Sequence, residues 1–548
     1  MKNAGKKIIA LLCVAALCMA GCSSNDSTVD STESGTTGTD VSTTSTGIDI
    51  AVASAYSDKA LDDSYDESDA TKIALNQDSV TVSGSGAKVD GTTVTITEKG
   101  TYIVSGTLED GQIVVNLTED KNVQLVLDNA NITCSDSAAI LVSSVKNLYL
   151  TLADGSSNTI ADGSTYNEES VADGINAAIY SKDDLIINGT GSLNVTGNYT
   201  DGITSKDDLQ IISGNITVQA VDDAVVGKDS ICVRDAILNL TAGGDTMKSS
   251  NAEDTSKGYV VIDNGSITLN AGDDAIHSET VLTINAGTID VQSCVEGLES
   301  LNIVLNGGDI NVVSSDDGIN VSGGNDSTST DSPMMGRGGG MDAAIDGTLY
   351  INGGNLSVDA KGDGLDSNGN IVMTGGCVVV SGPTDAGNGA LDFAGTFELS
   401  GGTLLVSGIT GMVQVPSEDS SQVSMAVTFD DGIAAGSEIT VTDESGNVLY
   451  SFTANKSSNM ILVSGEELVE GATYTITAGS ASTTATGGDT SIAGSGTGMQ
   501  GGGMMPGNKG DMTMPENDGT MTRPEDDGTM TRPEDDGTVT TPDNGAEI

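Results

Sequence analysis

Tryptophan is absent from this chain of 548 residues, and only four phenylalanines and one histidine occur. Binding of neutral sugars usually relies on aromatic platforms, for which the chain offers little beyond its eleven tyrosines. Basic residues are also scarce, because 21 Lys and Arg stand against 79 Asp and Glu, a net charge of −58. Nucleic-acid binding needs clustered Lys and Arg, so the composition excludes nucleic acid as a partner.

Cysteine pairs at metal-binding or redox spacing are missing as well. Outside the first 22 residues the chain has Cys134, Cys232, Cys294 and Cys377, which are far apart and form no CxxC motif. All four lie in strand-like contexts, so we expect them to be small buried apolar residues and expect no zinc site.

The N-terminus has the features of an export signal, predicted over residues 1–21. Three lysines precede the apolar run Ile8–Ala20, which is too short to be a comfortable membrane span. The run ends in Met19-Ala20-Gly21-Cys22, which resembles a bacterial lipobox. The resemblance implies lipidation of Cys22 and a lipid-anchored protein on the outer face of the cell membrane; a plain secretory signal is the alternative. Cleavage leaves 18 basic residues against 79 acidic ones, a net charge of −61.

Three segments have compositions that do not favour packing. Residues 22–74 are rich in Ser, Thr, Asp and Gly, and we expect a disordered linker there. Residues 479–548 contain the phrase Met-Thr-x-Pro-Glu-x-Asp-Gly at a period of nine, which predicts a disordered tail. A Gly- and Met-rich insertion at residues 324–341 predicts a projecting loop.

The rest of the chain is built on one repeated phrase, an acid followed by a small residue and an aliphatic one. Successive acids of this phrase are 22, 22, 29, 22, 21 and 46 residues apart, and the two long steps contain insertions. A period close to 22 predicts a solenoid in which each repeat is one turn. The acids of the phrase are Asp201, Asp223, Asp245, Asp274, Glu296, Asp317 and Asp363.

A second phrase in the same repeats predicts the kind of solenoid. Segments such as Ile284–Val291, Leu305–Val312 and Ile351–Val358 combine Gly turns with alternating apolar and polar residues, the period of a β-strand. We therefore predict an all-β protein whose residues 75–422 form a right-handed parallel β-helix. Residues 423–478 lose the rhythm and predict a small antiparallel cap over the open end.

The acids of the first phrase should form a ladder along one edge. Equivalent positions in stacked turns are about 4.8 Å apart, and neighbouring carboxylates repel by roughly 3 kcal/mol at an effective dielectric near 20. Raised carboxylate pKa values or bound cations would relieve this repulsion, and oxygen-rich corners suit Ca²⁺. A solvated acidic edge is the alternative. The predicted calcium ligands are Asp201, Asp222, Asp223, Asp245, Asp273, Asp274, Glu296, Glu299, Asp316, Asp317, Asn320, Asp363 and Asp366, and His277 occupies an equivalent position.

Two further stretches resemble a known family. The runs Gly100–Leu108 and Val123–Ile132, with the acid-Gly repeats and the ending near Tyr450–Thr475, are similar to clostridial carbohydrate-binding β-helix proteins, which are related in fold to polysaccharide lyases. The likeness covers about residues 75–478. It implies a calcium-containing right-handed β-helix that binds plant cell-wall polysaccharide, both cellulose-like and acidic, without established catalysis.

Three functions follow from these observations. We favour a monomeric, non-catalytic surface lipoprotein that binds polysaccharide by calcium bridges between its own carboxylates and those of uronates. The second is a calcium-dependent polysaccharide lyase of the pectate type, for which Lys248 is the best candidate base. The third is a structural or adhesive stalk that calcium only stiffens.

Overall fold

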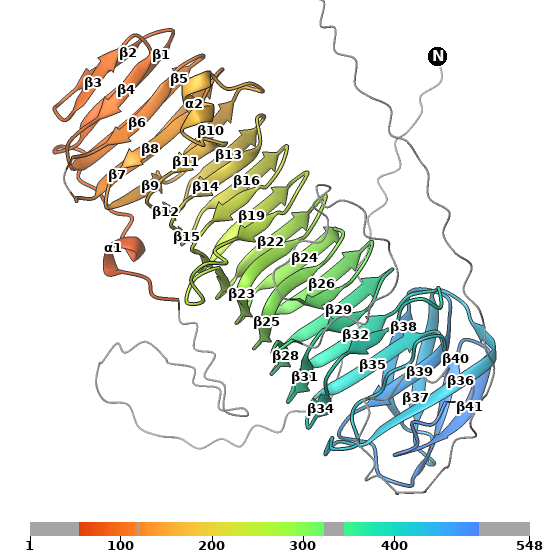
Figure 1. Cartoon of the computed structure of the whole chain (residues 1–548). Coiled ribbons are helices and arrows are strands. Elements are labelled where there is room, and N and C mark those ends of the chain that lie inside the picture. The colour runs from red at the N-terminus through yellow and green to blue at the C-terminus, as the bar shows by residue number, and fades with distance from the viewer. Residues whose placement is uncertain (1–53, 119, 323–344, 493–548) are drawn as a thin grey trace, which may run out of the picture. The chain divides into compact units, whose positions relative to one another are not determined.

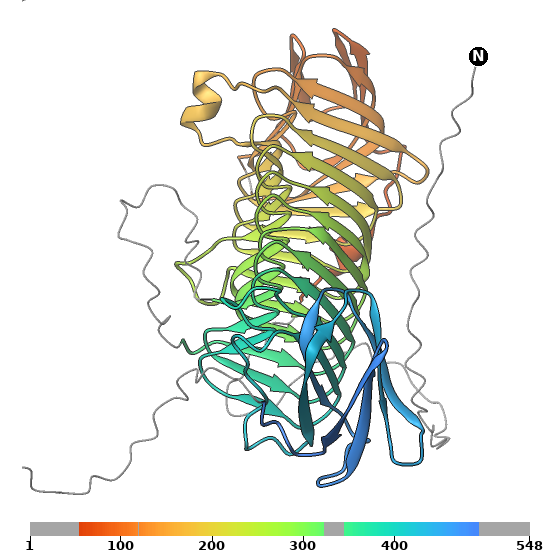
Figure 2. The ribbon, with the colours of Figure 1, turned by 90° about the vertical axis from the view of Figure 1, so that its right-hand side faces the viewer.

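The computed structural model describes residues 54–118, 120–322 and 345–492. The signal peptide, Cys22, the insertion at 324–341 and almost all of the predicted tail lie outside these residues. The described part is almost entirely β-structure. Its two short helices are α1 (Asp58–Leu61) and α2 (Glu168–Ala172), and α2 projects from the N-terminal turns (Figure 2). No helix in the described ranges is long and apolar enough to cross a membrane.

The chain coils as a parallel β-helix whose turns contribute strands to three columns (Figure 1). The ladder column carries the predicted acids and stacks in parallel from its first to its last strand. It consists of β4 (Thr93–Ile96), β6 (Gln112–Asn116), β8 (Ile140–Ser144), β11 (Ala177–Ser181), β14 (Asp201–Ser205), β17 (Val225–Gly227), β20 (Met247–Ser249), the first parts of β23 (Ile276–Ile284) and β25 (Leu298–Leu305), β27 (Ile319–Val321), β30 (Leu365–Ser367) and β33 (Leu391–Phe393).

The second column follows the ladder column within each turn and is also parallel. It consists of β1 (Thr71–Gln77), β5 (Gly100–Leu108), β7 (Val123–Cys134), β9 (Asn147–Leu152), β12 (Asp184–Gly189), β15 (Asp208–Ile211), β18 (Ser230–Val233), β21 (Tyr259–Ile262), the second parts of β23 and β25, β28 (Thr348–Ile351), β31 (Asn370–Met373) and β34 (Phe397–Leu399).

The third column completes each turn and returns the chain to the ladder column. It consists of the ends of β5 and β7, then β10 (Ser157–Asp162), β13 (Ser192–Gly197), β16 (Asn215–Ala220), β19 (Ala236–Thr241), β22 (Gly265–Asn270), β24 (Thr288–Ser293), β26 (Asp309–Ser314), β29 (Asn355–Ala360), β32 (Cys377–Ser381) and β35 (Thr403–Gly408).

Antiparallel strands lie at both ends of the coil, where a parallel column would leave an open edge. At the start, β2 (Val80–Ser83) pairs with β1, and β3 (Ala87–Asp90) pairs with β4. At the end, β39 (Ser458–Ser464) pairs with β35 and with β36 (Ser424–Ile433). A separate four-stranded sheet contains β37 (Ser437–Thr442), β38 (Val448–Ala454), β40 (Thr473–Ala478) and β41 (Ala481–Thr486). The predicted antiparallel cap is therefore confirmed, but it extends beyond its predicted end at residue 478. The tail prediction is wrong for β41, which pairs with β40 in the cap sheet.

The interior of the coil is one continuous apolar core. The aliphatic residue of each acid phrase points into it, from Ile203 to Leu365, and these side chains are fully buried. Cys134, Cys232 and Cys294 are buried as well, as expected of small apolar residues, whereas Cys377 is only half-buried, contrary to that expectation. Burial of these aligned aliphatic stacks supplies the main driving force for folding.

The linker prediction is wrong for residues 54–74. This stretch contains α1 and the start of β1, and Ala60 of α1 is buried against the side chains of Tyr149, Ile186 and Ile212. Its Ser- and Asp-rich composition concealed a few apolar side chains that dock on the coil.

Candidate functional site

The acid phrases of successive turns stack in register along the edge of the coil where the ladder column begins. In each turn the residue after the acid donates its backbone N–H to the carbonyl of the next acid, as Gly202 does to Asp223 and Ala224 does to Asp245. The two long steps keep the same register, because Lys248 pairs with His277 and Asn320 pairs with Asp366 across the insertions. The predicted ladder of aligned acids is therefore present.

The small residue after each acid is required by close packing between turns. At Gly318, an added Cβ would lie 2.2 Å from Cγ1 of Val358 and 2.7 Å from the carbonyl oxygen of Gly364. Contacts this short would push the third column and the next turn away. The small residue therefore keeps successive acids one strand spacing apart.

One oxygen of several carboxylates holds the following turn in place. The backbone N–H of Asp245 donates to Oδ1 of Asp223 at 2.8 Å, and that of Asp274 donates to Oδ1 of Asp245 at 2.9 Å. Asp363 donates in the same way to Asp317 at 2.5 Å. These acids thus satisfy backbone donors that the coil would otherwise bury unpaired. The other oxygen remains for a cation or a second hydrogen bond.

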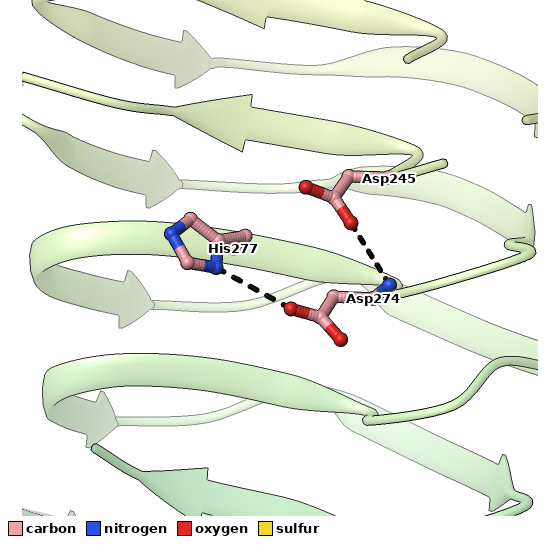
Figure 3. A group of neighbouring side chains, drawn as sticks. All are labelled: Asp245, Asp274 and His277. Atoms are coloured by element: carbon pink, nitrogen blue, oxygen red, sulfur yellow. Dashed lines mark hydrogen bonds and ion pairs between the residues drawn. The ribbon is translucent and has the colours of Figure 1, made fainter. Parts of the chain in front are cut away.

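In the middle of the ladder the protein supplies its own cations. Nζ of Lys248 lies 2.8 Å from Oδ2 of Asp245 and 3.6 Å from Oδ2 of Asp223. Nδ1 of His277 lies 3.3 Å from Oδ2 of Asp274 and 2.7 Å from Oε2 of Glu299. Figure 3 shows Asp245, Asp274 and His277 converging from neighbouring turns.

The histidine is charged in this setting. Burial disfavours the imidazolium, but hydrogen bonds with Asp274, Glu279 and Glu299 outweigh it and raise the pKa of His277 to about 12. Burial also raises the pKa of Asp274, to about 9, whereas His277 holds the pKa of Glu299 down at about 2. In the middle of the ladder, charge is therefore balanced by Lys248, by His277 as the counter-ion of Glu299, and by a proton on Asp274.

The C-terminal end of the ladder is different. Among the described residues, Glu296, Asp317 and Asp363 form no ion pair with a basic side chain. Burial raises the pKa of Glu296 to about 7, and burial with repulsion from Asp363 and Asp366 raises that of Asp317 to about 8. Burial also raises the pKa of Asp363, to about 6. The first of the two expected responses to like charge, raised carboxylate pKa values, is thus present here.

An amide oxygen at this end has no partner. Asn320 Nδ2 donates to Oε2 of Glu296 at 2.5 Å, while its Oδ1 is buried and accepts no hydrogen bond from any described residue. A buried carbonyl oxygen without a donor costs free energy, and a cation would satisfy it. Asn320 stands in register between Glu299 and Asp366. The oxygen-only donor set around it fits a calcium ion.

The N-terminal end repeats this arrangement with a residue that sequence reasoning missed. Asn176 Nδ2 donates to Oδ2 of Asp201 at 2.5 Å, and its own Oδ1 is buried without a described partner. Burial and repulsion from Asp223 raise the pKa of Asp201 to about 7. The only signal for Asn176 was its place just before Ala177-Ala178-Ile179, one residue out of step with the acid phrase.

In three turns a second acid directly precedes the ladder acid, and it is less buried than that ladder acid. Asp222 and Asp316 are exposed and Asp273 is half-buried. At Gly362 an added Cβ would lie 2.3 Å from Oδ1 of both Asp316 and Asp317, so these two carboxylates converge over the glycine. The exposed acids therefore border the candidate site without forming its buried part.

Among the described residues, four groups of side chains are close enough to share one ion, and three of these groups lie on the ladder. One of these three groups contains Asp392, which extends the ladder one turn beyond the predicted set. Asp392 was missed at the level of the sequence because Gly389 stands where its phrase should have an acid. The fourth lies on another corner of the coil, between the ladder and second columns. The groups are Asp245, Asp274 and His277; Asp274, Glu296 and Glu299; Asp363, Asp366 and Asp392; and Asp184, Asp207 and Asp208.

Lys248 is placed unfavourably for the role of a general base. A base must be neutral before it accepts a proton, and two carboxylates around an ammonium stabilise its charged form. The contacts with Asp223 and Asp245 instead suit a residue that balances charge.

The sequence of this chain is similar to those of known proteins. Residues 90–335 match the family model described as carbohydrate-binding domain-containing protein. A carbohydrate-binding domain-containing protein of Acetivibrio thermocellus is 40% identical over 222 residues, which cover 40% of this chain and 78% of the relative. The solved structure of a polysaccharide lyase-like protein from C. thermocellum, a gadolinium derivative, shows 36% identity over 44% of this chain and 93% of its own, with a TM-score of 0.39. On the strength of the relative's identity and coverage, the chain belongs to the carbohydrate-binding domain-containing protein family.

Proposed function

We propose that the ladder column binds calcium and, through it, an acidic polysaccharide at the cell surface, without catalysis. The observation that carries this proposal is the buried Oδ1 of Asn320, which has no described partner and lies in register with acidic side chains. The raised pKa values of Glu296, Asp317 and Asp363 support it, because these carboxylates need a proton or a cation to be buried together.

The residues proposed to hold calcium lie at the C-terminal end of the ladder. They are Glu296, Asp317, Asn320 and Asp363, with Asp366 and Asp392 in the neighbouring positions. Calcium takes six to eight oxygen ligands, so coordination positions not filled by these side chains are open to ligand oxygens. A uronate carboxylate supplies such oxygens. The shortage of aromatic side chains favours this mode over stacking of neutral sugars.

The polysaccharide part of the proposal is supported by the family to which the chain belongs. The name of the Acetivibrio thermocellus relative states carbohydrate binding. A chain with a net charge of −58 repels uronate-containing polymers, so it can hold them only through a divalent cation. Cellulosic polymers remain the second class that the resemblance implies.

The proposed place of action is the outer face of the cell membrane. It is supported by the Lys-rich start, the apolar run Ile8–Ala20 and the lipobox-like Met19–Cys22. An anchor at Cys22 would present the coil to polysaccharide outside the cell. Radiolabelled palmitate should enter the wild-type protein in the native host and should not enter a Cys22→Ala variant.

The binding test uses the full chain and insoluble polygalacturonate. The protein should sediment with the polymer in calcium and stay in solution after chelation. An Asp317→Asn/Asp363→Asn variant removes two half-buried charges while keeping acceptor oxygens for the backbone, and we expect it to lose calcium-dependent binding. Asp430→Asn/Asp431→Asn makes the same change in charge on exposed cap residues and should bind like the wild type.

Three outcomes would overturn the proposal. Equal sedimentation with and without chelator would remove calcium from the mechanism. Release of unsaturated uronates, seen as ultraviolet absorbance, would select the lyase instead. Failure of the wild type to bind any polysaccharide, together with calcium-dependent stiffening, would leave a structural stalk.

A further inference from the structure

The segment before the first strand runs along the outside of the second column. We call residues 54–70 the strap; from its C-terminal to its N-terminal part it crosses successive strands toward the C-terminal turns. In Figure 1, α1 of the strap lies outside the stacked strands. The polar contacts that mark its path are Gln124 Nε2 to the Ser64 carbonyl at 3.4 Å, Asn188 Nδ2 to the Ala60 carbonyl at 3.0 Å, Gln210 Nε2 to the Ala55 carbonyl at 3.4 Å, and Ser54 Oγ to Asp263 Oδ2 at 2.7 Å.

The strap covers apolar side chains on the outer surface of the second column. Ala60 packs against Tyr149, Ile186 and Ile212, with Tyr56 at the edge of the cluster. Strand residues that alternate with the core normally face water, so their apolar character predicts a cover. Over these turns the strap provides that cover.

The same surface stays apolar beyond the last described residue of the strap. Val281, Val304 and Tyr350 form a cluster with Tyr259 and Val372 at its border. These residues point away from the coil, because the alternate residues in their strands belong to the interior core. Yet Val304 and Tyr350 are only 7% and 6% exposed. The described members of the cluster all come from the sheet itself, on strands β21, β23, β25, β28 and β31.

We propose that residues 48–53 continue the strap and bind over this cluster. The sequence there is Ile48-Asp49-Ile50-Ala51-Val52-Ala53, followed by Ser54-Ala55-Tyr56. Its large apolar residues occupy even positions. Ser54 and Tyr56, which contact the sheet, are even as well. An extended segment in the same phase therefore turns Ile48, Ile50 and Val52 toward the sheet and Asp49 toward water.

The reach of the segment matches the extent of the cluster. Extended chain advances about 3.3 Å per residue and strands lie about 4.8 Å apart, so the six residues before Ser54 span roughly four strands. Counted from Asp263 at the end of β21, four strands lead across β23, β25 and β28 to β31. Val372 on β31 is the last residue of the cluster.

Covalent continuity favours this occupant over a second copy of the chain or a glycan. The segment is tethered at Ser54 beside the cluster, which gives it a high effective concentration. Two consequences follow. The spacer between Cys22 and the folded part shortens to residues 23–47. The outer surface of the second column is closed to polysaccharide, which leaves the ladder and third columns for binding.

The test is hydroxyl-radical footprinting of the full chain, with oxidation of Tyr350 measured by mass spectrometry. In the wild type we expect Tyr350 to be strongly protected. Ile48→Asp/Ile50→Asp should increase its oxidation several-fold. Ala51→Asp/Ala53→Asp adds the same charge to the same segment on the opposite phase and should leave Tyr350 protected.

The proposal fails if Tyr350 is oxidised in the wild type as readily as an exposed tyrosine, or if the Ile48→Asp/Ile50→Asp variant leaves it protected. Protection that disappears on dilution would assign the cover to a second copy of the chain, and protection that requires added polysaccharide would assign it to a glycan. Circular dichroism of each variant checks that the coil stays folded, because an unfolded coil would expose Tyr350 as well.

Discussion

The middle and the C-terminal end of the ladder are built from the same phrase but solve the problem of like charge differently. In the middle, Lys248 and His277 stand among the acids and pair with them. At the end, Asn320 and Asp366 take the equivalent positions, and the neighbouring carboxylates have raised pKa values. Raised carboxylate pKa values occur in both regions, since that of Asp274 in the middle is about 9. The two regions differ in the residue three positions after each acid, which is basic in the middle and an amide or a carboxylate at the C-terminal end.

The largest expected effect separates the two regions by pH and calcium. In the metal-free protein the folded-state pKa values of Glu296 and Asp317, about 7 and 8, lie above those of the unfolded chain. The folded state then binds more protons than the unfolded state between about pH 4 and 8, so stability falls as pH rises through this window. We expect the melting temperature without metal to fall by at least about 5 °C from pH 5 to pH 8.

Calcium is the control for that titration. It should restore most of the lost stability at pH 8 and little at pH 5, where protons already neutralise the carboxylates. The raised pKa values of His277 and Asp274 also make stability fall as pH rises, because the unfolded chain releases these protons while the folded protein keeps them; calcium should not reverse that part. A metal-free melting temperature that rises from pH 5 to pH 8 would contradict the account.

Removal of one carboxylate charge should have opposite effects on stability in the two regions. Asp245→Asn removes the partner that lies 2.8 Å from Lys248, and we expect it to destabilise the protein by about 2–4 kcal/mol. Asp317→Asn removes a charge whose pKa is raised, so it should raise metal-free stability at pH 8 by about 1–2 kcal/mol and weaken the response to calcium. Urea unfolding of both variants at pH 8 measures the difference; effects of equal sign would argue against distinct regions.

A substitution three positions after a ladder acid should give the middle of the ladder the calcium dependence expected of the C-terminal end. Lys248→Asn places an amide where Asn320 stands at the C-terminal end, and it leaves Asp223 and Asp245 without their cation. We expect a loss of roughly 2–3 kcal/mol in chelator and a partial recovery in calcium. Lys248→Arg keeps the charge and should need no calcium. If calcium fails to stabilise Lys248→Asn, or stabilises Lys248→Arg equally, the residue three positions after the acid does not determine how its turn responds to calcium.

The smallest effects are expected at the exposed acids. Asp222 and Asp316 are solvated, so Asp222→Asn and Asp316→Asn should change stability by less than about 0.5 kcal/mol. Calcium affinity measured by titration calorimetry should change less in these variants than in Asp317→Asn. A larger loss from Asp316→Asn than from Asp317→Asn would move the site to the surface.

The fold and the ladder could be predicted because the repeat has a fixed period and buries one aliphatic residue per turn. Ile203 through Leu365 fix the register, and the acids two positions earlier must then align. Residues outside the regular repeat were harder to predict. Asn176 and Asp392 belong to turns whose phrase is imperfect, and the strap is short, polar and outside the repeat. The counter-ion roles of Lys248 and His277 depend on side-chain contacts between turns, which no single repeat specifies.

The most direct measurement is a crystal structure of the protein in calcium, compared with one in chelator. The account predicts calcium bound at the C-terminal end of the ladder, with Oδ1 of Asn320 and carboxylate oxygens of Asp317 or Asp363 about 2.3–2.6 Å from the ion. It predicts that Lys248 and His277 keep their ion pairs and that calcium is missing between Asp245 and Asp274. Calcium in the middle with Lys248 displaced, or none at the C-terminal end, would contradict it.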